Sequence, residues 1–261
     1  MTIAIGIIAK KTIWMAADSQ TTRGNVKMND AKKISVLQLA GAQALIAEAG
    51  SAGVCQRIIE VMQGMAKSEP LKDYRTVADI AQKAMAFVRS ELRQQFADFS
   101  LQEFNDFLRA NEYDAQLMIA HFFNEEPQIY IANFILGFAT RAADKNHAQY
   151  AAIGTGAQTA EYILSKLNIK EIDHTNDATN INVTTMYVVE EVKRVDTHCG
   201  GSMMTGIVHS ANVAAVVPPN ETMEKVIKII KEEDRSFSVE WRLKVERMIA
   251  AVIKARQTGQ L

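Results

Sequence analysis

The sequence predicts an α+β fold in which two stacked β-sheets lie between layers of helices. Two observations lead to this prediction. Short β-rich segments occur in groups with helical segments between the groups, and the N-terminal strands are apolar on both faces. Grouped strands argue against the regular strand–helix alternation of a parallel sheet. Strands that are apolar throughout need cover on both faces, so helices are expected outside each sheet.

The first 49 residues are expected to form strands. Ile3 to Ile8 and Thr12 to Ala17 are short and β-rich, and the polar pair Lys10-Lys11 between them is typical of a hairpin. A second pair of strands is expected at residues 34–39 and 44–49, and it has the same mostly apolar character.

The pattern then changes to helical spacing. Between residues 52 and 67 the apolar side chains recur at intervals of three and four, as one face of a helix requires, and residues 76–96 repeat this spacing. A shorter helix is expected at residues 101–110, where Ser100 is a candidate N-cap and Glu103 follows three residues later.

The same two patterns predict the remaining elements. Strands are expected at 116–123, 128–132 and near 149–153, helices at 157–167 and 179–194, and a closing strand pair at 203–209 and 213–217. Two amphipathic helices with charged outer faces are expected at 221–233 and 239–256. A chain of 261 residues can bury one large core, so we expect residues 1–261 to form a single domain, with a division into two domains as the alternative.

Composition predicts a soluble globular protein. Hydrophobic residues make up 48% of the chain and the formal net charge is −1, so nothing indicates a nucleic-acid or polybasic membrane surface. No apolar run approaches the length of a membrane span, and the N-terminus lacks the features of a signal peptide. Cys55 and Cys199 form no spaced metal motif; free thiols in a reducing compartment are expected, with one disulfide as the alternative. We therefore expect a cytoplasmic protein without nucleic-acid or membrane partners.

Three polar residues near the N-terminus have the chemistry of a hydrolytic site. Thr2 opens the first strand, Asp18 follows the second, and Lys33 precedes the third. Loss of Met1 would give Thr2 a free α-amine, whose reference pKa of about 8 suits it to accept the hydroxyl proton. A neighbouring Lys33 ammonium would lower the pKa of both groups, and Asp18 would hold that lysine in place. Gly50, between a strand and a helix, offers a backbone N–H for an oxyanion.

Several motifs around these residues resemble one known family. The segments Ala16-Ala17-Asp18-Ser19, Gly24, Lys32-Lys33-Ile34 and Ala49-Gly50-Ser51-Ala52 resemble the N-terminal third of proteasome β subunits and of the related peptidase subunit of a bacterial ATP-dependent protease. The spacing matches apart from one residue fewer between Gly24 and Lys33. Downstream, Ala152-Ile153-Gly154-Thr155-Gly156 and Asp196-Thr197-His198-Cys199-Gly200-Gly201 are similar to the family's Gly-Ser-Gly and Asp-x-x-Ser-Gly-Gly motifs. The resemblance covers most of residues 2–217.

The resemblance implies a role for each of these residues. Thr2 is implied as the nucleophile, Lys33 as the residue that tunes it, and Asp18 as the partner of Lys33. The N–H of Gly50 is implied as the oxyanion donor. The residues implied to surround the threonine amine are Thr155, Asp196 and Cys199. The family usually has serine at the first and last of these three positions; the threonine keeps the hydroxyl, whereas a thiol is only a weak donor and acceptor.

Glu48 is the residue that bears on specificity. In the family, the position two before the oxyanion glycine lines the pocket for the side chain that precedes the scissile bond. A carboxylate at this position favours Lys or Arg in the pocket. The alternative is that Glu48 pairs with a lysine of its own chain.

The resemblance also implies a fold and an activity. The fold is the four-layer αββα sandwich of the N-terminal nucleophile hydrolases, and the activity is that of a threonine peptidase which forms an acyl-enzyme on Thr2 after removal of Met1. Family members assemble into rings or related oligomers, so we expect a homo-oligomer that acts on polypeptides, with an ATPase unfoldase as a possible partner. No cofactor or metal is expected. Residues 98–113 and the C-terminal helices within 221–256 resemble additions to the common core.

Two other functions stay open at this point. One is a proteasome-like assembly subunit without catalysis, which retention of Met1 and the presence of Cys199 would favour. The other is an amidase that uses the same nucleophile on a small substrate. Intact Asp18, Lys33 and Gly50 favour an enzyme, because a purely structural chain has no need of all three.

A cysteine nucleophile is disfavoured. Cys199 and its neighbour His198 would point to opposite faces of a strand, and Cys55 falls on the apolar face of a predicted helix, where an inert buried thiol is usual. His121 and His147 are expected to be core or surface residues and not metal ligands. The chain contains no Gly-x-x-x-x-Gly-Lys-Ser/Thr loop, so it is not expected to bind ATP through that motif.

Overall fold

The computed structural model describes residues 2–9, 11–23, 26–29, 31–110, 113–167, 178–211, 213–218, 220–221 and 223–232. The chain divides into two compact units, Met1–Pro219 and Asn220–Leu261. In the second unit residues 223–232 are helical, within the helix expected at 221–233, and the helix expected at 239–256 lies outside the described residues. The single domain expected for residues 1–261 stays a prediction.

One sheet of the first unit contains the two N-terminal strands. Its order is β10 (Tyr150–Gly154), β1 (Ile3–Ile8), β2 (Thr12–Asp18), β11 (Met203–His209) and β12 (Ala214–Val217), and every neighbouring pair is antiparallel. All residues of β1 are buried, as a strand with cover on both faces requires. Because β1 and β2 are adjacent and antiparallel, the start of β1 lies beside the end of β2.

The other large sheet is an antiparallel meander. It consists of β5 (Ile34–Leu39), β6 (Ala42–Gly50), β7 (Ala115–Phe123), β8 (Glu126–Asn133) and β9 (Phe138–Asp144), paired in chain order. Along β7, Leu117 and Ile119 belong to the hydrophobic cluster shared with the helices, whereas Met118 and Ala120 belong to the cluster shared with the first sheet. Successive side chains of a strand point to opposite faces, so both faces of β7 are buried.

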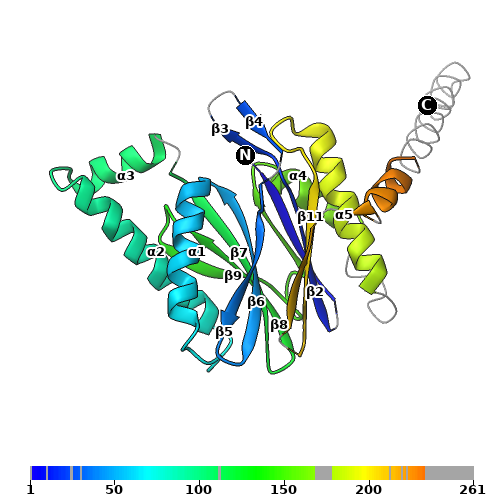
Figure 1. Cartoon of the computed structure of the whole chain (residues 1–261), viewed down its shortest axis with the longest axis horizontal. Coiled ribbons are helices and arrows are strands. Elements are labelled where there is room, and N and C mark those ends of the chain that lie inside the picture. Colours follow the sequence, from blue (N-terminus) through cyan, green and yellow to red (C-terminus); the bar gives the residue numbers. More distant parts are fainter. Residues whose placement is uncertain are drawn as a thin grey trace, which may run out of the picture. The chain divides into compact units, whose positions relative to one another are not determined.

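Helices cover the outer face of each sheet. α1 (Ala52–Ala66) and α2 (Thr76–Gln95) pack on the second sheet, and α4 (Ala157–Lys166) and α5 (Ala178–Val195) pack on the first. Figure 1 shows the resulting order of layers, helices–sheet–sheet–helices. α3 (Leu101–Ala110) projects beyond α2 in the same view and buries only Phe104 and Leu108.

The predicted fold class is therefore confirmed. The predicted capping box of α3 is also present, because the N–H of Glu103 donates to Ser100 Oγ at 3.2 Å and the N–H of Ser100 donates to Glu103 Oε2 at 2.7 Å. No helix in the described part of the chain is long and apolar enough to cross a membrane.

The sequence patterns did not predict three of the strands. The short strands β3 (Thr21–Arg23) and β4 (Val26–Met28) form a separate two-stranded sheet. β9 is an edge strand, and several of its residues are exposed. Its sequence therefore shows neither an alternation of apolar and polar residues nor a continuous apolar segment. Its position is decided by pairing with β8, which the local sequence does not show.

Candidate active site

Thr2, Asp18 and Lys33 meet at one end of the two sheets. Thr2 lies directly before β1, Asp18 is the last residue of β2, and Lys33 directly precedes β5. The pairing of Ala4 with Ala17 brings the first two residues together. All three are buried, with relative exposures of 3% for Thr2, 0% for Asp18 and 3% for Lys33. The three polar residues predicted to cooperate are thus neighbours inside the protein.

The Lys33 ammonium is the centre of this site. It donates short hydrogen bonds to Thr2 Oγ1 and to the carbonyl oxygen of Gln20, and its Nζ lies 2.8 Å from Asp18 Oδ1. These three acceptors match the three N–H donors of an ammonium. A charged donor directed at Thr2 Oγ1 stabilises negative charge on that oxygen, which is what an attacking hydroxyl needs.

Asp18 is held by backbone donors as well as by the lysine. The N–H of Ile3 donates to Oδ1 at 3.1 Å, and the N–H of Gly200 donates to Oδ2 at 2.9 Å. Hydrogen bonds to a buried carboxylate offset the free-energy cost of removing its charge from water. The orientation of Asp18 therefore depends on β1 and on the turn that follows α5.

The charge of Lys33 depends on its carboxylate partner. Burial lowers the pKa of Lys33 below its ordinary value, because an ammonium loses solvation inside the protein. The charge and hydrogen bond of Asp18 act in the opposite direction, and Cys199 and Glu48 do so to a smaller extent. Asp18 is therefore the main group that keeps the charged form of the lysine stable inside the protein.

Gly50 occupies the junction between β6 and α1. Its φ is 95°, and a Cβ at this position would lie 2.3 Å from the carbonyl oxygen of Asp114. The same carbonyl accepts the N–H of Ser51 at 2.6 Å. Only glycine fits this close approach and this backbone conformation, so the residue implied as the oxyanion donor is also required by the backbone.

Gly154 brings the backbone of β10 against Thr2. Its φ is also 95°, and a Cβ there would lie 2.0 Å from the carbonyl oxygen of Thr2 and 3.4 Å from the Cβ of Ala49. Ala49 directly precedes Gly50, so the end of β6 and Thr2 approach the same glycine. The close approach of three strands thus places the Gly50 segment beside Thr2.

The two downstream motifs also reach this site. The N–H of Gly156 and the hydroxyl of Thr155 donate to the carbonyl of Thr2, each at 3.5 Å. Thr155 Oγ1 lies 3.9 Å from Cys199 Sγ, and the Cys199 thiol donates to Asp196 Oδ2 at 3.4 Å. Thr155, Cys199 and Asp196 thus form a connected group next to Thr2, and their role around the threonine amine stays a prediction.

The Cys199 thiol is held in its neutral form. Burial raises the pKa of Cys199 to about 12, and the nearby carboxylates of Asp18 and Asp196 act in the same direction. Burial alone would raise the pKa of Asp196, but hydrogen bonds from the His198 N–H and the Cys199 thiol, together with the nearby Thr155 hydroxyl, lower it overall. A thiol that stays protonated is a poor nucleophile.

The second cysteine is further evidence against a cysteine nucleophile. Cys55 is fully buried, its thiol donates to the carbonyl of Ala49 at 3.4 Å, and burial raises its pKa. Both cysteines are free thiols. The expectation that His198 and Cys199 lie on a strand is wrong, because both lie in the connection between α5 and β11.

Glu48 is half-buried beside the lysine. Its N–H donates to the carbonyl of Lys33 at 3.0 Å. Burial raises the pKa of Glu48 to about 7, and the positive charge of Lys33 limits this shift. Within the described residues no ion pair joins this carboxylate to a lysine, and the role of Glu48 in a specificity pocket stays a prediction.

Sequence reasoning missed three contributors to the site. The backbone N–H groups of Ile3 and Gly200 and the carbonyl of Gln20 bind Asp18 or Lys33 directly. A backbone group carries no residue-type signal, so no pattern indicates these contacts. Gln20 follows Asp18 by two residues, and this proximity was the only available hint.

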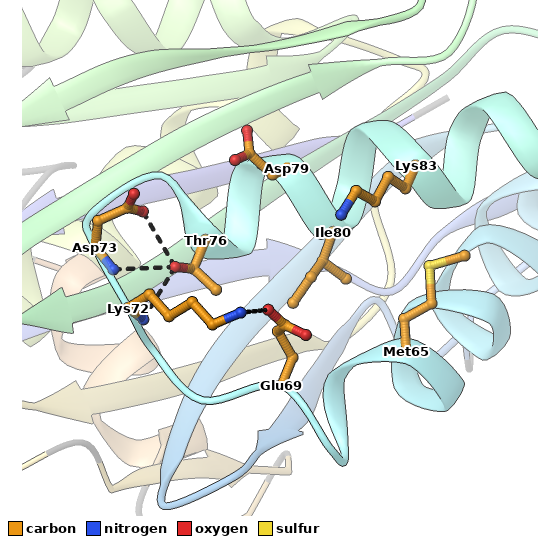
Figure 2. A pocket seen from close by; sticks show the side chains of 8 residues that line it. All are labelled: Met65, Glu69, Lys72, Asp73, Thr76, Asp79, Ile80 and Lys83. Carbon is orange, nitrogen blue, oxygen red and sulfur yellow. Dashed lines mark hydrogen bonds and ion pairs between the residues drawn. The ribbon is translucent and has the colours of Figure 1, made fainter.

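One hollow between α1 and α2 is lined by Met65 and Ile80 together with polar and charged side chains, and Figure 2 shows that Lys72 in this lining contacts Glu69, with Nζ and Oε1 2.6 Å apart. Another hollow between these helices includes Ser51, the residue after Gly50, in its lining. No group of three potential metal ligands occurs among the residues that the structure describes.

Comparison with known families identifies the family of this chain. A family model described as proteasome subunit matches residues 2–195. The chain belongs to the proteasome subunit family. The match includes Thr2, Asp18, Lys33, Gly50 and Thr155 but ends just before the turn that carries Cys199.

Solved structures similar to this proteasome-family chain include several Anbu proteins. Anbu (ancestral beta-subunit) from Yersinia bercovieri has a TM-score of 0.69 and 11% identity, with 92% of this chain and 96% of that chain covered. The Anbu complex from Pseudomonas aeruginosa, solved as a helical assembly, has a TM-score of 0.71 and 12% identity, with 94% and 96% covered. A Gly-1 mutant of Anbu from Hyphomicrobium sp. strain MC1 has a TM-score of 0.67 and 14% identity, with 91% and 97% covered.

At these identities the similarity shows a shared fold and nothing finer. No curated protein matches the sequence. The shared fold is that of the proteasome-like N-terminal nucleophile hydrolases, as the resemblance of the sequence motifs implied.

Proposed function

We propose that this proteasome-family chain is a threonine peptidase in which Thr2 is the N-terminal nucleophile. The observation that carries the proposal is the buried lysine that contacts both Thr2 Oγ1 and Asp18. Buried ion pairs rarely stabilise a fold more than apolar residues of similar volume do. Groups with perturbed pKa values around a reactive side chain are typical of catalytic sites.

The mechanism requires that Thr2 becomes the first residue through removal of Met1. The free α-amine then takes the hydroxyl proton, directly or through a water, while Oγ1 forms a bond to the substrate carbonyl carbon. Lys33 stabilises the charge on Oγ1, and the Gly50 N–H is the donor to the oxyanion. The substrate amine leaves with a proton from the Thr2 ammonium, and water hydrolyses the resulting ester to release the acid and restore the hydroxyl.

Glu48 gives this peptidase a preference for cleavage after Lys or Arg. Its carboxylate is half-buried, and a cationic side chain that enters the pocket would pair with it. Family membership and the similarity to the Anbu complex of P. aeruginosa support a homo-oligomer, as a ring or a related assembly. Mass photometry of the purified protein tests this assembly.

The test of the activity starts from protein purified from its own host. We expect the intact mass to lack Met1, short fluorogenic peptides to be hydrolysed, and a threonine-directed electrophile to add once, at Thr2. Short peptides need no unfolding, so the assay is independent of an ATPase. Thr2→Ala should abolish both hydrolysis and labelling, whereas Thr140→Ala, at an exposed position on β9, should retain both.

The outcomes separate the candidate functions. Complete retention of Met1, or unchanged turnover in the Thr2→Ala variant, would refute the peptidase mechanism. A protein that assembles and lacks Met1, but neither hydrolyses peptides or small amides nor reacts with the electrophile, is the non-catalytic assembly subunit. Hydrolysis of small amides without hydrolysis of any peptide identifies the amidase.

A further inference from the structure

Gln20 connects the Lys33–Asp18 pair to the turn that follows α5, although no sequence motif indicates this role. The residue lies between β2 and β3 and is only 5% exposed. A buried carboxamide needs hydrogen-bond partners, and the identity of those partners shows what the side chain holds in place.

The backbone of Gln20 touches both the lysine and the turn after α5. Its carbonyl accepts a hydrogen bond from Lys33 Nζ, and its N–H donates to the carbonyl of Gly200 at 3.0 Å. Gly200 in turn donates its own N–H to Asp18 Oδ2 at 2.9 Å. Gln20 therefore supplies one of the acceptors of the Lys33 ammonium and also contacts Gly200, which orients Asp18.

The side chain of Gln20 clamps the same turn. Its Nε2 donates to the carbonyl of His198 at 3.0 Å, directly before Cys199. Its Oε1 would lie 2.4 Å from a Cβ at Gly200, so the carboxamide packs directly against this glycine. Lys27 adds a bond from Nζ to the carbonyl of Thr197 at 2.7 Å, on the exposed side of the turn.

We propose that Gln20 is a positioning residue, whose side chain holds the turn with Cys199 and Gly200 in register with the Lys33–Asp18 pair. This inference rests on the proposed function for its consequence on catalysis. Without the carboxamide, the His198 carbonyl loses a buried donor and Gly200 is free to move. The hydrogen bond from Gly200 to Asp18 then lengthens, and the ammonium shifts from Thr2 Oγ1.

The test is Gln20→Met, which keeps the length of the side chain and removes its hydrogen bonds. Displacements of about 1 Å at a catalytic group lower rates by as much as about 100-fold, so we expect kcat to fall about 10-fold while KM changes less than about twofold. The matched control is Gln43→Met. Gln43 also binds a distant backbone group, the Ala214 N–H at 2.7 Å, but it lies at the opposite end of β6 from Gly50.

A second readout is independent of catalysis. The rate of Cys199 alkylation, mapped by peptide mass spectrometry, should rise several-fold in Gln20→Met because the turn that buries this thiol is released. Cys55 on α1 is the internal reference and should be unchanged. If Gln20→Met is insoluble, Lys27→Met loosens the same turn from its exposed side and should change kcat and Cys199 alkylation in the same direction, with smaller size.

Failure of this inference differs from failure of the proposed function. An inactive wild-type protein refutes the peptidase function. The rate of Cys199 alkylation in Gln20→Met then decides whether Gln20 holds the turn in place. An alkylation rate and a kcat that match wild type in Gln20→Met would overturn the positioning role. Equal losses in Gln20→Met and Gln43→Met would also overturn it, because they would show a general loss of stability.

Discussion

The Nζ atom of Lys33 lies 2.8 Å from Oδ1 of Asp18, and both side chains are almost completely excluded from solvent. Removal of one partner leaves the other as an unpaired buried charge, which typically costs about 3–5 kcal/mol. We therefore expect Asp18→Asn to lower the free energy of unfolding by an amount in this range and to abolish peptide hydrolysis.

Urea unfolding of this variant and of the double variant Asp18→Asn/Lys33→Met measures the effect. The double variant should recover part of the lost stability, because it contains no unpaired ammonium. Glu69→Gln removes an exposed ion pair with Lys72, which solvent screens, and should leave stability nearly unchanged. If Asp18→Asn lowered the free energy of unfolding as little as Glu69→Gln does, the buried pair would not be important for stability.

A methyl group at Gly154 should displace the nucleophile. Ala at this position would clash with the carbonyl of Thr2 and would also adopt an unfavourable φ of 95°. We expect Gly154→Ala to lower the melting temperature and to abolish labelling of Thr2. The control is Gly64→Ala, in the exposed part of α1 with open space around it, which should be neutral or stabilising by about 0.5–1 kcal/mol.

The preference for cationic side chains should depend on pH. Burial raises the pKa of Glu48 to about 7, so its carboxylate is mostly ionised above this pH and mostly neutral below it. The ratio of hydrolysis after Lys to hydrolysis after Leu should therefore rise between pH 6 and pH 8. The ratio of the two substrates cancels pH effects on the nucleophile. In Glu48→Gln the ratio should be low at every pH; a ratio that still rises with pH would exclude Glu48 as its source.

His121 should make the protein sensitive to mild acid. Its ring is fully buried on β7 and stacks on Tyr130 with ring centroids 5.9 Å apart, and burial lowers its pKa from 6.5 to about 4. Between these values the unfolded chain binds a proton that the folded chain does not. Stability therefore falls as pH drops from 6.5 to 4, by about 3 kcal/mol from this group.

The comparison of His121→Phe with wild type isolates the contribution of His121 to the pH dependence of stability. Phenylalanine keeps the ring contact with Tyr130 and does not titrate. The difference in free energy of unfolding between pH 7 and pH 4.5 should be smaller in the variant. Identical pH dependence in His121→Phe and wild type would refute the assignment.

Cys199→Ser should preserve or increase the activity. A hydroxyl is a better hydrogen-bond donor than a thiol, and it fits the same place between Thr155 and Asp196. Cys199→Val keeps the volume and removes the donor, so it should lower the rate of Thr2 labelling. If valine and serine gave equal rates, hydrogen bonding at this position would have no part in the reaction.

Local patterns were sufficient for most of the fold. Apolar runs and helical spacing predicted β1, β2, α1 and α2 to within about two residues, because these elements are buried on the faces that their sequences mark. The strands that were missed are short or lie at an edge. In β9 the exposed side carries no apolar signal, and only pairing with β8 makes it a strand.

The residue types that make up the site could be predicted from the sequence alone. Thr2, Asp18, Lys33 and Gly50 were recognisable from their chemistry and from their places at strand ends. How these residues are held depends on the packed chain, in which backbone groups of Ile3 and Gly200 bind Asp18 and the carbonyl of Gln20 binds Lys33. Every residue carries the same N–H and C=O groups, so the packing of the chain decides which of them reaches a buried charge.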